Sequence, residues 1–75
     1  MRAFILLDVR TGKCPEVIGK LRKIEGVTSA NACWGRPDVF VVVDVPNQSV
    51  LSDTVLNKIQ TIDGIESTDT HIVID

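Results

Sequence analysis

The residues best suited to binding chemistry stand in one short stretch, CWGRPD, directly before the most apolar run of the chain. The carboxylate of Asp38 can accept hydrogen bonds from a charged donor, and the guanidinium of Arg36 can hold a carboxylate through two parallel hydrogen bonds. Gly35 would let a ligand approach the backbone. The stretch is equally typical of a plain turn, in which Pro37 fixes the backbone, Asp38 caps it and Trp34 packs at the edge of the core. Residue types alone leave both interpretations open.

Thr68 and Thr70 lie two residues apart in a β-branched segment, so a strand would turn both hydroxyls to one side, where they could contact the same ligand. Simple strand propensity explains them as well. His71 would point the other way, and no sequence neighbour provides the nucleophile or substrate proton that a catalytic base needs. We therefore expect no catalytic residue.

Metal and cofactor chemistry find no support in the sequence. The single histidine and the two cysteines, Cys14 and Cys33, fit no common zinc spacing and form no CxxC motif. One possible pair does not make a disulfide framework, so we expect both thiols to be reduced. The sequence predicts no metal site and no cofactor.

Length and charge narrow the class of protein. The 75 residues make one domain, residues 1–75, and a chain this short buries only about 60% of the surface that its unfolded form exposes. The net charge of -2 argues against direct nucleic-acid binding, which needs a dense basic face. No apolar run approaches the length of a membrane span, and Asp8 and Arg10 interrupt the first one. We expect a cytoplasmic protein without membrane or nucleic-acid partners.

The chain repeats a pattern of strand, helix, glycine and strand. The run FILLDV at residues 4–9 recurs as FVVVDV at residues 40–45, and KIEGVTS at residues 23–29 is echoed by TIDGIES at residues 61–67. The two halves together predict the order βαββαβ.

Both predicted helices carry an apolar stripe and end at a glycine. The first begins near Pro15 and ends before Gly26, and the second is capped by Asn47 or Ser49 and ends before Gly64. The stripes are Val17, Ile18, Leu21 and Ile24 in the first helix and Leu51, Val55, Leu56, Ile59 and Ile62 in the second.

Two such units with right-handed crossovers predict an α+β fold, the ferredoxin-like plait, with a four-stranded antiparallel sheet in the order 4-1-3-2 and two helices on one face. The two strands that would be central, residues 3–9 and 39–45, are apolar on both faces. Because the helices can cover only one face, we expect a second copy to cover the other. The sequence therefore predicts a dimer, closed by sheet-to-sheet stacking or as a barrel.

The chain resembles the effector-binding (RAM) domain of the leucine-responsive and asparagine-responsive regulators, the Lrp/AsnC family, over essentially all its residues. Besides the first strand, the resemblance rests on TGK at residues 11–13, LRKIEGV at 21–27, GRPD at 35–38, IDGI at 62–65 and STDT at 67–70. Its best marker is Gly35-x-x-Asp38 ahead of an apolar strand. One departure is Pro37, where relatives usually carry an aromatic or other large residue.

The resemblance implies a domain that dimerises, assembles into rings of dimers, and binds small effectors, typically amino acids, near this turn and the last strand. Asp38 would accept from an α-ammonium group and Arg36 would meet the carboxylate. The expected ligand-binding residues are Trp34, Gly35, Arg36, Asp38, Thr68 and Thr70.

Full-length family members also carry a helix-turn-helix domain, whereas here the first strand begins almost at Met1. We therefore expect a stand-alone, non-enzymatic module for amino-acid sensing and oligomerisation, linked to transcriptional regulation and able to mix with full-length regulators. Two alternatives remain. One is a small dimeric α+β-barrel enzyme of the monooxygenase or isomerase type, with His71 or Asp38 as acid or base, and the other is a purely structural oligomerisation domain.

Overall fold

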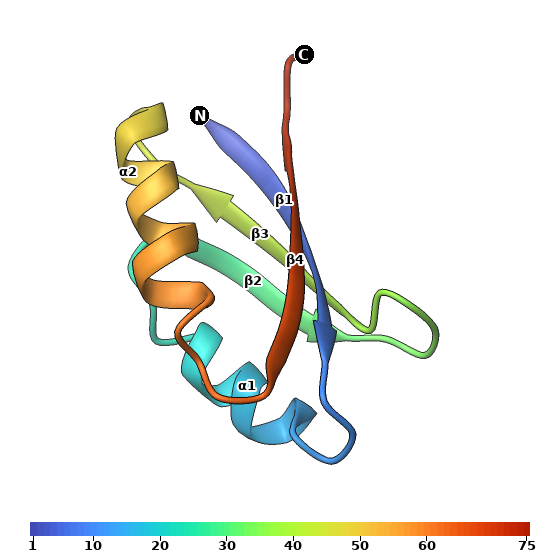
Figure 1. Ribbon diagram of the computed structural model, residues 1–75. Helices are drawn as coiled ribbons and strands as arrows, with labels where there is room; N and C mark the ends of the chain where they lie inside the picture. The colour runs from blue at the N-terminus through green and yellow to red at the C-terminus, as the bar shows by residue number, and fades with distance from the viewer.

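The computed structural model describes residues 1–75, and its elements follow the order expected from the sequence repeat (Figure 1). They are β1 (Arg2–Val9), α1 (Cys14–Leu21), β2 (Val27–Ala32), β3 (Val39–Asp44), α2 (Gln48–Asp53) with its π-helical continuation η1 (Thr54–Ile59), and β4 (Ile65–Ile72). Neither α1 nor the helix formed by α2 and η1 has the length and apolarity that crossing a membrane requires.

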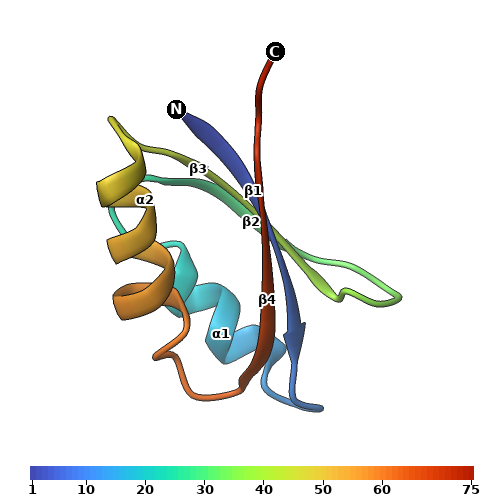
Figure 2. The same cartoon turned by 45° about the horizontal axis from the view of Figure 1, so that its top comes forward.

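The four strands form one antiparallel sheet in the order β2-β3-β1-β4. β1 lies at its centre, where Leu7 is opposite Val39 on β3 and Thr68 on β4. Both helices pack on the same side of the sheet, and the other side is open (Figures 1 and 2). The predicted plait is confirmed.

The core lies between the helices and one face of the sheet. Alternate residues of the two central strands point into it, because successive strand side chains face opposite ways. The buried apolar residues are Ala3, Ile5, Leu7 and Val9 from β1, Val39, Val41, Val43 and Val45 from β3 and its end, Ala30 from β2, and Val17, Leu21, Leu51, Val55 and Ile59 from the helices. The remaining alternate positions on β1 and β3 face away from the helices.

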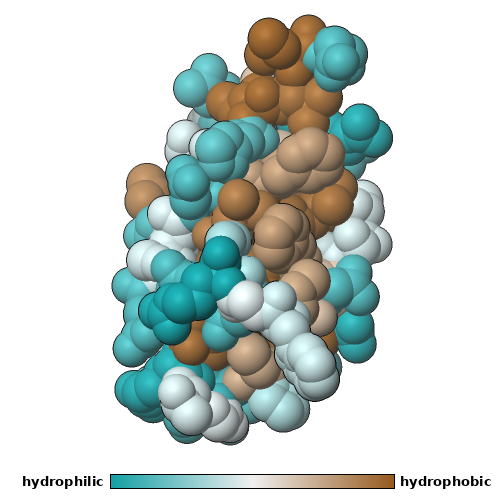
Figure 3. All heavy atoms as spheres, turned by 90° about the vertical axis from the view of Figure 1, so that its right-hand side faces the viewer, coloured by the Kyte–Doolittle hydropathy of each residue, from teal (hydrophilic) through white to brown (hydrophobic).

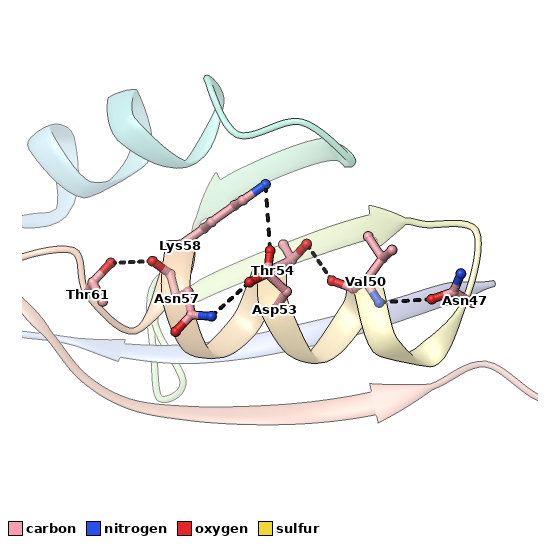
Figure 4. Close-up of polar contacts among 7 residues, drawn as sticks. All are labelled: Asn47, Val50, Asp53, Thr54, Asn57, Lys58 and Thr61. Atoms are coloured by element: carbon pink, nitrogen blue, oxygen red, sulfur yellow. Dashed lines mark hydrogen bonds and ion pairs between the residues drawn. The ribbon is translucent and has the colours of Figure 1, made fainter.

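The second helix is capped by Asn47, whose side-chain Oδ1 accepts from the Val50 N–H at 2.9 Å (Figure 4). Polar contacts then follow one another along its length, including Thr54 Oγ1 to the Val50 carbonyl at 2.9 Å and Asn57 Nδ2 to Asp53 Oδ1 at 2.7 Å. The turn of helix widens in η1, where the Gln60 N–H bonds to the carbonyl of Val55, five residues back.

Two residues of this helix differ from the expected apolar stripe. Thr54 is buried, and its hydroxyl is satisfied by the helix backbone. Leu56, expected in the apolar stripe, is instead 56% exposed and lines a groove between the helix and β4. In the first helix the regular turns end at Leu21, three residues earlier than the apolar stripe suggested.

The turn before β4 is fastened to the start of α1. Lys13 Nζ lies 3.2 Å from Asp63 Oδ2, and Arg10 lies 3.5 Å from the same oxygen. The hydrogen bond from Lys13, its charge and that of Arg10 lower the pKa of the Asp63 carboxyl. The next residue, Gly64, is buried at a φ of +105°, and a Cβ there would lie 2.8 Å from Lys13 Cβ.

We predict that Gly64→Ala destabilises the fold much more than Gly12→Ala. Gly12 also has a positive φ, of +85°, but nothing lies within 4 Å of the position of its Cβ. Gly12→Ala should therefore lower the free energy of unfolding by about 1–2 kcal/mol, because alanine is strained in a left-handed backbone conformation. Gly64→Ala should lower it by about 1–3 kcal/mol more, because the added Cβ has no room. Urea unfolding of the two variants measures the difference, and equal losses would contradict the packing described for Gly64.

Candidate functional site

The stretch between β2 and β3 is a hairpin connection that projects beyond the sheet, away from the helices (Figures 1 and 2). Trp34 at this connection is fully exposed, so its expected packing at the edge of the core is wrong. Gly35 has a φ of +119° with open space around it, and the Arg36–Pro37 peptide bond is cis. The connection therefore presents an aromatic ring, bare backbone and a guanidinium to its surroundings.

Asp38 fastens this hairpin to the end of β1. Its side-chain Oδ1 accepts from the Val9 N–H at 3.0 Å, and its own N–H donates to the Leu7 carbonyl at 3.1 Å. Its carbonyl accepts from the Cys33 N–H at 2.7 Å, which closes the turn. The side chain therefore bonds to β1 rather than capping the turn as expected, and its role as an ammonium acceptor stays a prediction.

Cys14, the first residue of α1, lies beside the same carboxylate. Its Sγ is 3.9 Å from Asp38 Oδ2. Burial, followed by the negative charge of Asp38 and the hydrogen bond to it, raises the pKa of the Cys14 thiol. Cys33 is exposed.

A second carboxylate at this end of the sheet, Asp8, was not among the residues expected from the sequence. Its Oδ2 accepts from the Ser67 hydroxyl at 2.7 Å, and its Oδ1 lies 3.9 Å from Arg36 Nε. Oδ1 is buried and has no hydrogen-bond partner. The signal in the sequence is that Asp8 is a charged residue that follows the apolar run from Ala3 to Leu7 and precedes Val9, the last residue of β1.

Thr68 and Thr70 face the helix side of the sheet. They pair across β1 with Leu7 and Ile5, whose side chains lie in the core, and Gln60 Nε2 donates to Thr68 Oγ1 at 2.9 Å. The two threonines share one side, as expected. Within one chain they are nevertheless separated by the sheet from the side on which Ser67, Asp8 and Arg36 meet.

The open face of the sheet carries an apolar patch formed by Phe4, Leu6, Phe40 and Val42. Together with Val41 and His71 these residues line a shallow hollow of about 570 Å³. Phe4 and Phe40 are 41% and 43% exposed. Figure 3 shows this side of the molecule, where apolar side chains gather in a band along its length. His71 lies at the margin, with Nε2 3.0 Å from Asp69 Oδ2.

The fold and this site define a plait-type α+β domain with an uncovered apolar sheet face and a polar hairpin at its end. The family model of the Lrp/AsnC ligand binding domain matches residues 2–75, and the chain belongs to this family.

Curated relatives and solved structures agree with this assignment. The regulatory protein AsnC of Escherichia coli K12 is 38% identical over 72 residues, which cover 95% of this chain and 47% of AsnC. The chain thus spans about half the length of the curated relatives it matches.

The solved structure of E. coli AsnC superposes with a TM-score of 0.92 at 33% identity, covering 99% of this chain and 50% of that one. FFRP-DM1 gives the same TM-score and identity over 97% of both chains. The transcriptional regulator NMB0573 of Neisseria meningitidis, solved in complex with L-Met, shares the fold with a TM-score of 0.89 at 22% identity, over 99% of this chain and 49% of that one.

We predict that iodoacetamide modifies Cys33 faster than Cys14, because the thiolate is the reactive form and the pKa of Cys14 is raised. Asp38→Asn should speed the modification of Cys14 and leave Cys33 unchanged, since it removes the negative charge beside Cys14. Cys14 of this variant should still react more slowly than Cys33, because burial raises the pKa of Cys14 more than Asp38 does. Mass spectrometry of each cysteine over time measures both rates, and an Asp38→Asn variant with unaltered Cys14 kinetics would refute the electrostatic contact.

Proposed function

We propose that this chain senses an amino acid and oligomerises in the service of transcriptional regulation, and that it acts by binding rather than by catalysis. Membership of the Lrp/AsnC ligand-binding family and the regulators among its relatives support this. The observation that carries the proposal is the pairing of an uncovered apolar sheet face with a polar hairpin at its end.

The apolar patch formed by Phe4, Leu6, Phe40 and Val42 is the surface proposed for dimerisation. The two phenylalanine rings offer large contact areas, and a face of this kind lowers its free energy by leaving water. A second copy provides a matching surface, because a twofold axis places the same patch on both sides of the interface. Sheet-to-sheet stacking is therefore the proposed dimer.

The hairpin is the proposed effector site. Trp34 and Gly35 leave room for a ligand, Arg36 can bind its carboxylate, and Asp38 holds the turn in place. In a ring of dimers, the Thr68 hydroxyl would reach such a ligand from a neighbouring copy. The L-Met complex of the Neisseria regulator, which shares this fold, favours an amino acid as the effector.

The enzyme alternative has less support. His71 and Asp69 form a pair beside the apolar hollow, but both side chains are more than half exposed. The curated relatives are transcriptional regulators, which points to a protein that is not an enzyme.

The proposal predicts that at least one of the twenty protein L-amino acids raises the melting temperature. A ligand held at 100 times its dissociation constant adds about 2.7 kcal/mol to the free energy of unfolding. Arg36→Gln should abolish the shift, because it removes the group that binds the carboxylate.

Arg10→Gln is the matched control. Arg10 is also exposed and also lies near one carboxylate, 3.5 Å from Asp63, but it stands outside the hairpin. If no amino acid changes the melting temperature of the wild-type protein, the result contradicts amino-acid sensing and favours the purely structural alternative.

A further inference from the structure

We propose that Asp8, rather than Asp38, binds the ammonium group of the amino acid, and that Asp8 and Arg36 together hold its zwitterionic head group. This inference rests on the amino-acid site proposed above and names the residues that would recognise the ligand. The carboxylate of Asp8 and the guanidinium of Arg36 are adjacent, with Oδ1 and Nε 3.9 Å apart. Their charges match the two opposite charges of an amino acid.

The two oxygens of Asp8 differ in a way that suits ligand binding. Oδ2 accepts from the Ser67 hydroxyl at 2.7 Å, which orients the carboxylate. Oδ1 is buried without a hydrogen-bond partner. A buried carboxylate oxygen without a hydrogen-bond partner raises the free energy of the protein. A hydrogen bond to this oxygen therefore stabilises more than a hydrogen bond to an oxygen that water already solvates. An ammonium group can donate such a hydrogen bond.

The carboxylate of Asp38 is less available to a ligand than that of Asp8. Its Oδ1 already accepts from the Val9 N–H at 3.0 Å, and its Oδ2 faces the Cys14 thiol at 3.9 Å. Binding an ammonium group there would compete with the contact that fastens the hairpin to β1. Asp38 therefore acts as a positioning residue that places Arg36 beside Asp8.

Arg36 is free to exchange partners. Its side chain is 75% exposed, and the distance to Asp8 is too long for a hydrogen bond. Because no hydrogen bond joins the two groups, the exposed guanidinium can move aside without breaking one. An amino acid inserted between them would replace one long ion pair with two charge-assisted contacts and keep the charges balanced.

The test compares three variants that each remove one carboxylate charge, namely Asp8→Asn, Asp38→Asn and Asp44→Asn. In calorimetric titrations with the amino acid that raises the melting temperature most, Asp8→Asn should weaken binding by roughly 10- to 150-fold, the effect of losing a hydrogen bond between charged groups. Asp44→Asn is the matched control, because Asp44 ends β3 on the same side of the sheet but at the other end of β1, opposite Arg2. It should leave the affinity unchanged.

The N-acetyl derivative of the same amino acid provides a second measurement. It lacks the ammonium group, so wild type should bind it more weakly, and Asp8→Asn should cause no further loss. If Asp8→Asn does not fold, Ser67→Ala takes its place, since it keeps the charge but frees the carboxylate that Ser67 orients. Its binding should be weaker than wild type, and unchanged binding would overturn the inference.

Two further results would overturn it. One is an Asp8→Asn variant that folds and binds the amino acid as tightly as wild type, and the other is an Asp38→Asn variant that loses binding while Asp8→Asn keeps it. Both leave the proposed function intact, because wild type still binds. A wild-type protein that binds no amino acid refutes the function and the inference together.

Discussion

The structure depends on one constraint. The two central strands are apolar on both faces of the sheet, but the two helices can cover only one of these faces. On the helix side, Ile5 and Leu7 are completely buried. On the other side, Phe4 and Phe40 retain more than two fifths of their surface in contact with water. A sheet solvated on one face normally carries polar residues there. The open face thus exposes apolar side chains to water, and a second copy is the cover we propose.

The hairpin and the open face are physically connected, so the proposed ligand site could influence the proposed dimer. Asp38 ties the hairpin to the end of β1, and Asp8 on that strand contacts both Arg36 and Ser67. A ligand bound by Asp8 and Arg36 would therefore lie at the margin of the face proposed for stacking. Binding there would change the free energy of association, and by linkage association would change the affinity for the ligand.

Local patterns in the sequence predicted the order of elements, and the right-handed crossover rule then gave the sheet topology. Of the two residues expected as possible caps, Asn47 and Ser49, Asn47 is the cap. The local patterns wrongly included Leu56 in the apolar stripe, because even a regular helix turns this residue about 140° away from Leu51, and its side chain is exposed. Of the two interpretations of Trp34, packing at the core edge is wrong, because its side chain is fully exposed. The contact between Asp8 and Ser67 joins residues 59 positions apart in the chain, so no local sequence pattern predicts it.

Sedimentation equilibrium over a range of protein concentrations tests most directly whether the open face is covered by a second copy. The account predicts a dimer or a larger multiple of the 8.2 kDa chain at micromolar concentration. Phe40→Lys should shift the protein toward monomer, whereas Leu56→Lys, the same change at an exposed apolar residue on the helix side, should not. A single species near 8.2 kDa that unfolds cooperatively, at every concentration, would contradict the account.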